Sequence, residues 1–197
     1  MKGFRKDRSM YIAELDDVEK RILGGVFTDT ALLLGVDLRG DDGAEADSTV
    51  DALAADFLRE LTQEVGEPED PALARLLPSA SDDEKAAAEF RRLTEGDIRA
   101  TKVARLRKWV RAFRAPGALL YVPVNEAGEW VAALTDVRLV LASRLGIETE
   151  DDAEAIHAAG QPRGDSREEQ TQFALGQIYS ALTWLQESLL ETMMRGR

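Results

Sequence analysis

Acidic side chains and a single histidine are the residues of this chain that could hold a metal ion or carry acid–base chemistry. His157 closely follows five acids: Glu148, Glu150, Asp151, Asp152 and Glu154. A metal site needs several ligands that converge on one point and a second shell that orients them. This stretch has few apolar residues that could bury such a shell. We therefore expect His157 to lie exposed on a solvated helix.

Nucleophilic and hydrolytic chemistry gains little support from the other residue types. The 197-residue chain has no cysteine, which excludes thiolate metal sites and cysteine nucleophiles. With His157 on a solvated helix, a serine nucleophile has no credible base. Most carboxylates fall on polar faces or in a loop, and the glycines are too scattered to cradle a phosphate. We therefore expect a protein without catalytic activity, metal or cofactor.

The most unusual feature is a basic segment within an acidic chain. Residues 91–114 hold nine basic and two acidic residues, whereas the whole chain has a formal net charge of −12. The apolar residues of this segment recur at spacings of three and four, which predicts a helix with one buried face. Off that face lie the candidate partner-binding residues Arg99, Lys102, Arg105, Lys108 and Arg111.

Three interpretations of this basic face are open. Its charges pair with acids of neighbouring helices, which needs no function. Alternatively, the face binds an acidic protein partner or the acidic loop of the same chain. Nucleic-acid binding is the third interpretation. It is disfavoured because the remainder of the chain is strongly acidic and no aromatic stacking platform lies among the basic residues.

Apolar periodicity predicts a bundle of five to six main helices. The first follows a capping box at Asp16, and its expected buried face comprises Leu15, Val18, Ile22, Val26, Thr30 and Leu33. Further helices are predicted at 48–65, 71–77, 81–94, 98–114, 125–145, 149–157 and 166–193. The helices at 81–94 and 98–114 are expected in tandem across a bend. Asn125 is the expected N-cap of the helix that follows it.

Two short strands and an acidic loop complete the predicted fold. Residues 11–15 and 120–124 are rich in β-favouring types, and Pro123 restricts the second strand to a sheet edge. We expect the two strands to pair as a ribbon. Residues 36–47 are rich in Gly and Asp, which predicts a mobile loop that is dispensable for folding. The expected fold is thus mainly α: one helical domain over 1–197 with a small two-stranded β ribbon.

Hydropathy and charge suggest a cytoplasmic protein. No stretch approaches the apolar length that spans a bilayer, and the charged first residues are not followed by the apolar core of a signal peptide. The net charge of −12 repels anionic membranes over most of the surface. We therefore expect no membrane association.

Several stretches resemble an uncharacterised, mainly actinobacterial protein family. They comprise residues 11–15, 70–78, 89–95, 134–139, 144–146 and 183–189, and they span almost the whole chain. In them the chain is similar to the domain-of-unknown-function family number two thousand and seventeen, which has no assigned activity, cofactor or catalytic residue. Genes of this family often lie beside the gene for the Clp protease adaptor. The resemblance therefore implies a link with regulated proteolysis by gene neighbourhood alone.

The last predicted helix carries Tyr179 and Trp184 beside its apolar face. We expect both to pack in the core, while an exposed part of this line would form a homodimer or partner surface. The function that we predict is a non-catalytic protein-binding or regulatory module, with a Clp-system component of cytoplasmic proteolysis as its suggested partner. The alternative is a nucleic-acid-associated regulator that uses the basic helix.

Overall fold

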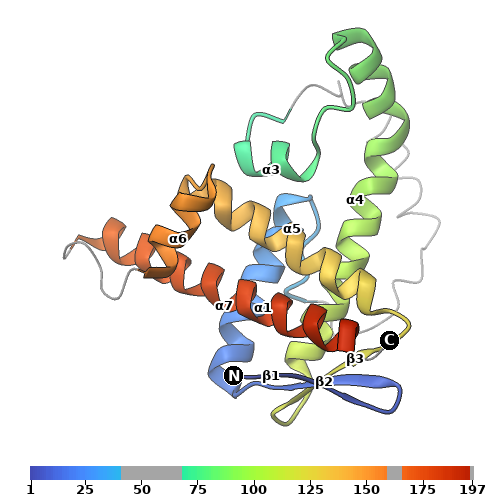
Figure 1. Ribbon diagram of the computed structural model, residues 1–197. Helices are drawn as coiled ribbons and strands as arrows, with labels where there is room; N and C mark the ends of the chain where they lie inside the picture. The colour runs from blue at the N-terminus through green and yellow to red at the C-terminus, as the bar shows by residue number, and fades with distance from the viewer. Residues whose placement is uncertain (41–67, 159–165, 196–197) are drawn as a thin grey trace.

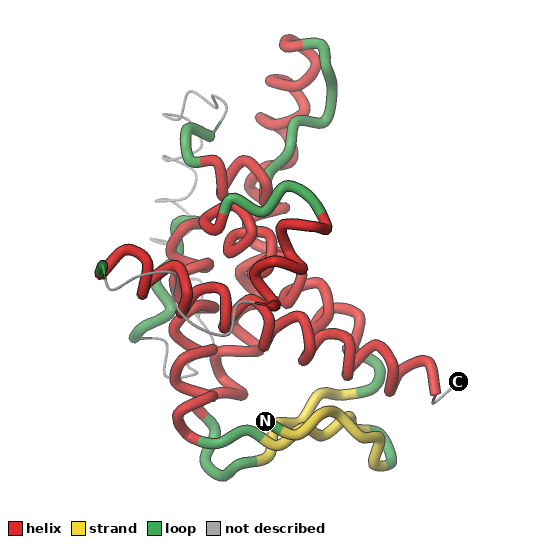
Figure 2. The backbone as a smooth tube through the Cα atoms, turned by 60° about the vertical axis from the view of Figure 1, so that its left-hand side comes forward, coloured by secondary structure: helices red, strands yellow, loops and turns green. Residues whose placement is uncertain are grey.

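The computed structural model describes residues 1–40, 68–158 and 166–195 as a mainly helical fold with one small sheet (Figure 1). The strands are β1 (Lys2–Asp7), β2 (Met10–Glu14) and β3 (Leu119–Pro123). The helices are α1 (Asp17–Leu33), α3 (Pro71–Leu76), α4 (Glu84–Arg114), α5 (Ala127–Leu145), α6 (Glu150–Ala158) and α7 (Arg167–Arg195). The sheet lies at one end of the helical body (Figure 2). The predicted fold class, mainly α with a small β element, is confirmed.

The sheet is antiparallel and has the order β1-β2-β3. Strand β2 pairs with β3 in the register Tyr11 to Val122 and Ala13 to Leu120, which confirms the predicted ribbon. Pro123 ends β3 at the edge of the sheet, where a missing amide donor costs no ladder hydrogen bond. The side chains of Tyr11, Ala13 and Val122 are buried and join the core.

Strand β1 was not predicted, so the ribbon has three strands rather than two. It pairs antiparallel with β2, and Phe4 is its one buried residue. Its outer edge is covered by α7: the amide of Phe4 donates to Ser188 Oγ (2.7 Å), and Thr192 Oγ1 donates to the Phe4 carbonyl (2.9 Å). A helix that covers a sheet edge protects it from pairing with another chain.

Helix α1 begins at the predicted capping box, in which Asp16 accepts from the amides of Val18 and Glu19. Its predicted buried face is wrong in part: Leu15 and Thr30 are buried, but other members of that face are not. Val18 is 56% exposed and Ile22 47%, whereas the buried residues of the helix include Leu23, Phe27 and Ala31. The helix carries two apolar stripes, and the aromatic residues of α4 pack against the second one.

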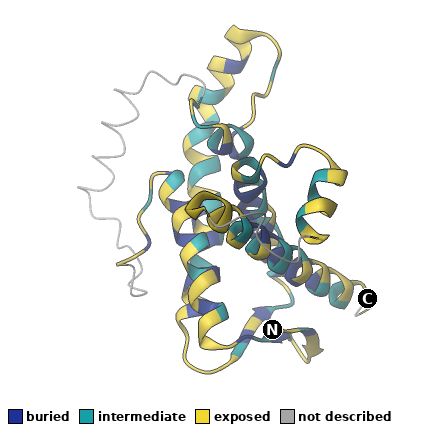
Figure 3. Ribbon diagram, turned by 90° about the vertical axis from the view of Figure 1, so that its left-hand side faces the viewer, coloured by how far each residue is buried: buried dark blue, intermediate teal, exposed yellow. Residues whose placement is uncertain are grey.

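Helix α4 is one continuous helix from Glu84 to Arg114, so the bend expected at 94–97 is wrong. Its N-cap is Asp83, two residues after the predicted start. The C-terminal half packs against α1 and α5. The N-terminal half projects from the body and is mostly exposed, as Figure 3 shows. The helix propagates through Gly96 because its backbone hydrogen bonds continue without a cap or a proline.

Helices α5 and α7 pack side by side, and α6 lies between the end of α5 and the start of α7. Gly146 ends α5 in the left-handed conformation with φ of 68°. The N-cap of α5 is Glu126 without a side-chain hydrogen bond, so the predicted cap at Asn125 is wrong. Ser166 and Glu169 form a capping box at the start of α7, in which the Glu169 amide donates to Ser166 Oγ (3.2 Å).

The predicted acidic loop is described only in its first part, residues 36–40. This part is anchored to the body: Leu38 is buried, and Arg114 Nη2 donates to the carbonyls of Leu38 (2.7 Å) and Arg39 (3.2 Å). The predictions for residues 41–47 and for the helix at 48–65 lie outside the described residues.

Candidate functional site

The basic residues of α4 lie on both sides of its apolar stripe. Val103, Leu106, Trp109, Val110 and Phe113 are buried between α1 and α5. Lys102 and Lys108 reach acids of α5 and its N-cap, whereas Arg99 reaches the carbonyl of Leu34, which follows α1. Because α4 packs against two helices, the residues of the predicted basic face contact different elements and do not form one continuous surface.

Lys102 forms a largely buried ion pair with Asp136 of α5. Its Nζ lies 2.5 Å from Asp136 Oδ1, and Asp136 is only 5% exposed. Asp136 Oδ2 is buried without a hydrogen-bond partner. Because removal of one partner from a buried pair leaves an uncompensated charge, Lys102 is required to neutralise Asp136 within the fold.

Lys108 bridges two acids at the start of α5. Its Nζ donates to Glu126 Oε2 (2.7 Å) and Glu129 Oε2 (2.8 Å). The hydrogen bonds to Glu126 and then Glu129 raise the pKa of Lys108, and the same bond lowers the pKa of Glu129. The charge of Arg105 lowers the pKa of Glu129 further. These side chains are about a third to a half exposed, so solvent weakens the interaction.

The remaining candidates differ in how much of their charge is engaged. Arg99 contacts Glu95 Oε1 with Nε (2.8 Å) and Nη2 (2.7 Å). Arg105 is partly exposed, and Arg111 is exposed and forms no ion pair with a described residue. Intramolecular pairing thus accounts for Arg99, Lys102 and Lys108, and it leaves Arg105 and Arg111 as candidates for contact with a partner.

His157 lies exposed near the end of α6, as predicted. The described parts of the chain contain no group of three or more His, Cys, Asp or Glu side chains placed to hold a metal ion. Asp152, one of the five acids that precede His157 in the sequence, instead caps the start of α6. Its Oδ2 accepts from the amides of Glu148 (3.1 Å) and Thr149 (2.9 Å).

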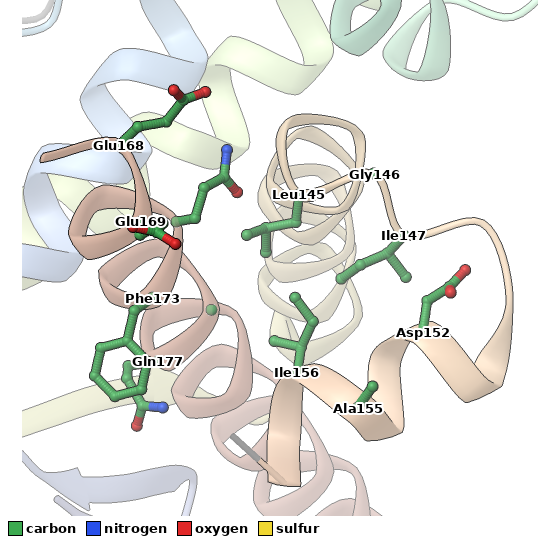
Figure 4. Close-up of a pocket in the computed structure, with 12 residues that line it drawn as sticks. Leu145, Gly146, Ile147, Asp152, Ala155, Ile156, Glu168, Glu169, Phe173 and Gln177 are labelled. Carbon is green, nitrogen blue, oxygen red and sulfur yellow. The ribbon is translucent and has the colours of Figure 1, made fainter. Parts of the chain in front are cut away.

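A groove of about 480 Å³ opens between the end of α5, α6 and the first turns of α7. Its apolar wall comprises Leu145, Ile147, Ala155, Ile156 and Phe173. Its polar lining comprises Asp152, Glu168, Glu169, Gln172 and Gln177. In Figure 4, Leu145 and Ile156 point from α5 and α6 toward α7. We name this hollow the α6–α7 groove.

The α6–α7 groove exists because α6 packs on α7 through a narrow contact. No residue of α6 is buried. A Cβ atom added to Gly176 of α7 would lie 3.0 Å from Ile156 Cγ2, so glycine permits the close approach at this point. Sequence reasoning missed the groove. The available signal was Gly176 itself, since a glycine inside an apolar helical pattern often marks a close packing contact.

The groove is acidic: the described residues of its lining include three carboxylates and no basic residue. Asp152 and Glu169 each use one oxygen in a helix cap: Glu169 Oε2 accepts from Ser166 Oγ (2.6 Å). The hydrogen bonds from the Thr149 amide, then the Glu148 amide and the Thr149 hydroxyl, hold the pKa of Asp152 below its ordinary value. Glu168 is exposed and forms no hydrogen bond with a described residue.

A second hollow, of about 490 Å³, lies between α1 and the end of α4. Its charged lining has both signs: Asp17, Lys20, Arg21, Asp29, Arg39 and Arg114. Arg39 is paired with Asp37, and Lys20 Nζ donates to the carbonyls of Ala115 (3.1 Å) and Gly117 (2.5 Å). Because the lining mixes positive and negative charges, it indicates no single class of ligand.

The two aromatic residues of α7 have different environments. Tyr179 is 9% exposed, and its hydroxyl accepts from Arg138 Nη2 (3.3 Å), so its predicted place in the core is confirmed. Trp184 is 41% exposed and lies beside Gly3 of β1, so its predicted burial is wrong. A single exposed tryptophan is normal on a soluble surface.

The fold and the groove define a class: a mainly helical domain with a small edge-covered sheet and an open, acidic, partly apolar groove. The chain belongs to the family described as Domain of unknown function (DUF2017), which matches residues 1–193. This match confirms the resemblance seen in the sequence. No curated protein and no solved structure matches the chain significantly. None of the described helices has both the length and the apolar composition needed to cross a bilayer.

Proposed function

We propose that this protein is a non-catalytic binding module that takes an apolar segment of a partner protein into the α6–α7 groove. The observation that carries the proposal is the apolar wall of Leu145, Ile147, Ile156 and Phe173 around an open hollow. Its volume of about 480 Å³ lies in the range of ligand sites, which is about 300–1,000 Å³. Covering this wall gains roughly 25 cal/mol for each Å² of apolar surface removed from water.

The composition of the groove supports binding over catalysis. Among the residues that the structure describes, its lining contains carboxylates and amides but no histidine, lysine, serine or tyrosine. Two of its three carboxylates, Asp152 and Glu169, already accept hydrogen bonds in helix caps. A general acid or base must instead face the reacting atoms with a pKa near the working pH.

The basic residues of α4 support the nucleic-acid alternative less well. Of the five candidates, Arg99, Lys102 and Lys108 are already neutralised by ion pairs, and Arg105 and Arg111 are the two without an ion pair to a described residue. Two cations on an acidic chain would release few counterions from a duplex. We propose these two residues as a secondary contact with an acidic protein surface, and a role in regulated proteolysis as the first context in which to search for the partner.

The proposal is tested with the ¹⁵N-labelled full chain and a series of acetylated, amidated hexapeptides that have a central leucine. Binding in the groove shifts the amide signals of 145–156 and 172–177 in NMR spectra. Ala155 lines the groove and is exposed, so Ala155→Trp fills the hollow and should abolish these shifts. Ala158→Trp, on the same helix outside the groove lining, should preserve them. If no peptide shifts these signals, or if Ala155→Trp has no effect, the proposal is wrong.

A further inference from the structure

We infer that the segment bound in the α6–α7 groove carries a positive charge beside its apolar side chain, and that Glu168 helps to select it. The inference rests on the proposed binding function and names the chemistry of the partner: a peptide segment in which a bulky aliphatic residue is flanked by lysine or arginine. The observation behind it is that Asp152, Glu168 and Glu169 lie beside the apolar wall, and that none of the described lining residues is basic.

The negative charge extends beyond the lining. Five acids lie in the stretch that leads into and forms the start of α6: Glu148, Glu150, Asp151, Asp152 and Glu154. The basic residue nearest to Glu168 in the chain is Arg167, which does not line the groove. An incoming cation therefore meets an attractive field, and a carboxylate meets a repulsive one. The apolar wall excludes water from one side, which strengthens these interactions relative to a fully solvated surface.

The helix caps leave carboxylate oxygens available to a ligand. Asp152 and Glu169 each line the groove and are held by a cap through one oxygen, and their other oxygens, Oδ1 and Oε1, form no hydrogen bond with a described residue. Such oxygens are preorganised acceptors for a charged N–H donor. Glu168 caps nothing among the described residues, so both its oxygens can accept.

A peptide fits this arrangement better than a metal ion does. The carboxylates do not form a cluster that could coordinate a cation, at least in the part of the chain that the structure describes. They stand instead on opposite walls: Asp152 on α6, and Glu168 and Glu169 on α7. Figure 4 shows the aliphatic side chains between these walls. A peptide with one aliphatic side chain between cationic residues could place the aliphatic group against the apolar wall and the cations near the carboxylates.

The test compares three hexapeptides that differ only in the residues flanking the central leucine, which are lysine, glutamine or glutamate. Isothermal titration of the full chain should give an affinity about threefold to fivefold higher for the lysine peptide than for the glutamine peptide. The glutamate peptide should bind most weakly. The preference should nearly vanish at about 1 M salt, where the Debye length falls to about 3 Å.

Variants of Glu168 assign the preference to the groove. Glu168→Gln should remove most of the preference for lysine, and Glu168→Lys should reduce it further or reverse it. Glu187→Lys is the matched control, because Glu187 is exposed on the same helix and does not line the groove. Melting curves of all variants separate loss of selection from loss of the helix start, which acidic residues also stabilise.

The outcomes separate the inference from the function on which it rests. If the lysine and glutamine peptides bind the groove equally, the positive charge is not selected, and the binding function stands without it. If Glu168→Gln lowers the melting temperature but keeps the lysine preference, Glu168 only stabilises the start of α7 and the inference is overturned. If no peptide of the series binds, the proposed function fails together with the inference.

Discussion

The two ends of the helical body differ in how closely their helices pack. Around Trp109, the rings of Phe27, Phe113 and Trp130 lie with centroids 4.9 to 5.3 Å away, and Trp109 is fully buried. At the other end, α6 buries none of its residues, and Gly176 of α7 allows Ile156 to approach closely. The first region stabilises the fold. The second leaves apolar surface uncovered, which is what a binding site requires.

Charged residues also differ between the two ends, in whether they pair across helices or within one helix. At the packed end, Lys102 and Asp136 neutralise each other across two helices. At the groove, Asp152 and Glu169 are satisfied by the starts of their own helices, and Glu168 by no described group. A cross-helix pair stabilises the tertiary structure, whereas a local cap stabilises one helix end and leaves the carboxylate near solvent. The acids of the groove are therefore the ones that a ligand can reach.

The largest expected effect is the loss of the aromatic centre. Trp109→Ala removes a fully buried ring and the hydrogen bond from its Nε1 to the Trp130 carbonyl (3.0 Å), so it should destabilise the protein by about 3–5 kcal/mol. Phe173→Ala, at the half-exposed groove wall, should cost about 1 kcal/mol or less. Urea unfolding followed by circular dichroism measures both. Equal losses would show that the two ends do not differ as described.

The second effect concerns the buried ion pair. Lys102→Met leaves Asp136 without its counter-charge and should destabilise the protein by about 3 kcal/mol. The double variant Lys102→Met with Asp136→Leu should recover most of that loss, because no isolated charge then remains. Arg111→Met is the control and should change stability little, because Arg111 is exposed on the same helix and forms no ion pair with a residue that the structure describes. A double variant as unstable as the single one would contradict this account.

Much of the fold follows from local signals in the sequence. Asp16, Gly146 and the pair Ser166 and Glu169 end or begin helices by chemistry that lies within a few residues. Pro123 also indicates an edge strand correctly, because proline has no amide hydrogen to donate to a second neighbouring strand. Such features are predictable because the hydrogen bonds that define them join neighbours in the chain.

A few failures are local, such as the cap expected at Asn125, and the larger ones are non-local. Strand β1 has one inward apolar residue, Phe4, and its edge is satisfied by hydroxyls of α7 that lie more than 180 residues later. The stripe with Val18 and the stripe with Phe27 are equally periodic, and only the aromatic residues of α4 decide which is buried. The groove likewise arises from three helices at once. The sequence identified the basic residues of α4, but it did not indicate which acids pair with them, such as Asp136 with Lys102.

The smallest effect is a titration confined to the groove end. Hydrogen bonds from the Thr149 amide, the Glu148 amide and the Thr149 hydroxyl lower the pKa of Asp152 below its ordinary 3.8. Because the folded pKa is the lower one, the contribution of these bonds to the stability of α6 is complete above about pH 5 and is lost as the pH falls through the folded pKa.

NMR titration of the Thr149 and Glu148 amides should therefore give a midpoint below 3.8. Asp152→Asn should remove this transition, since an amide does not titrate, while its oxygen can still cap the helix. Any transition of the amides around Trp109 in this pH range belongs to Glu129, whose pKa Lys108 lowers, and Asp152→Asn should leave it unchanged. A midpoint at or above 3.8 would contradict the lowered pKa of Asp152. A change of the Trp109 amides in Asp152→Asn would show that α6 is coupled to the packed core and that the groove does not behave as a separate, loosely held end.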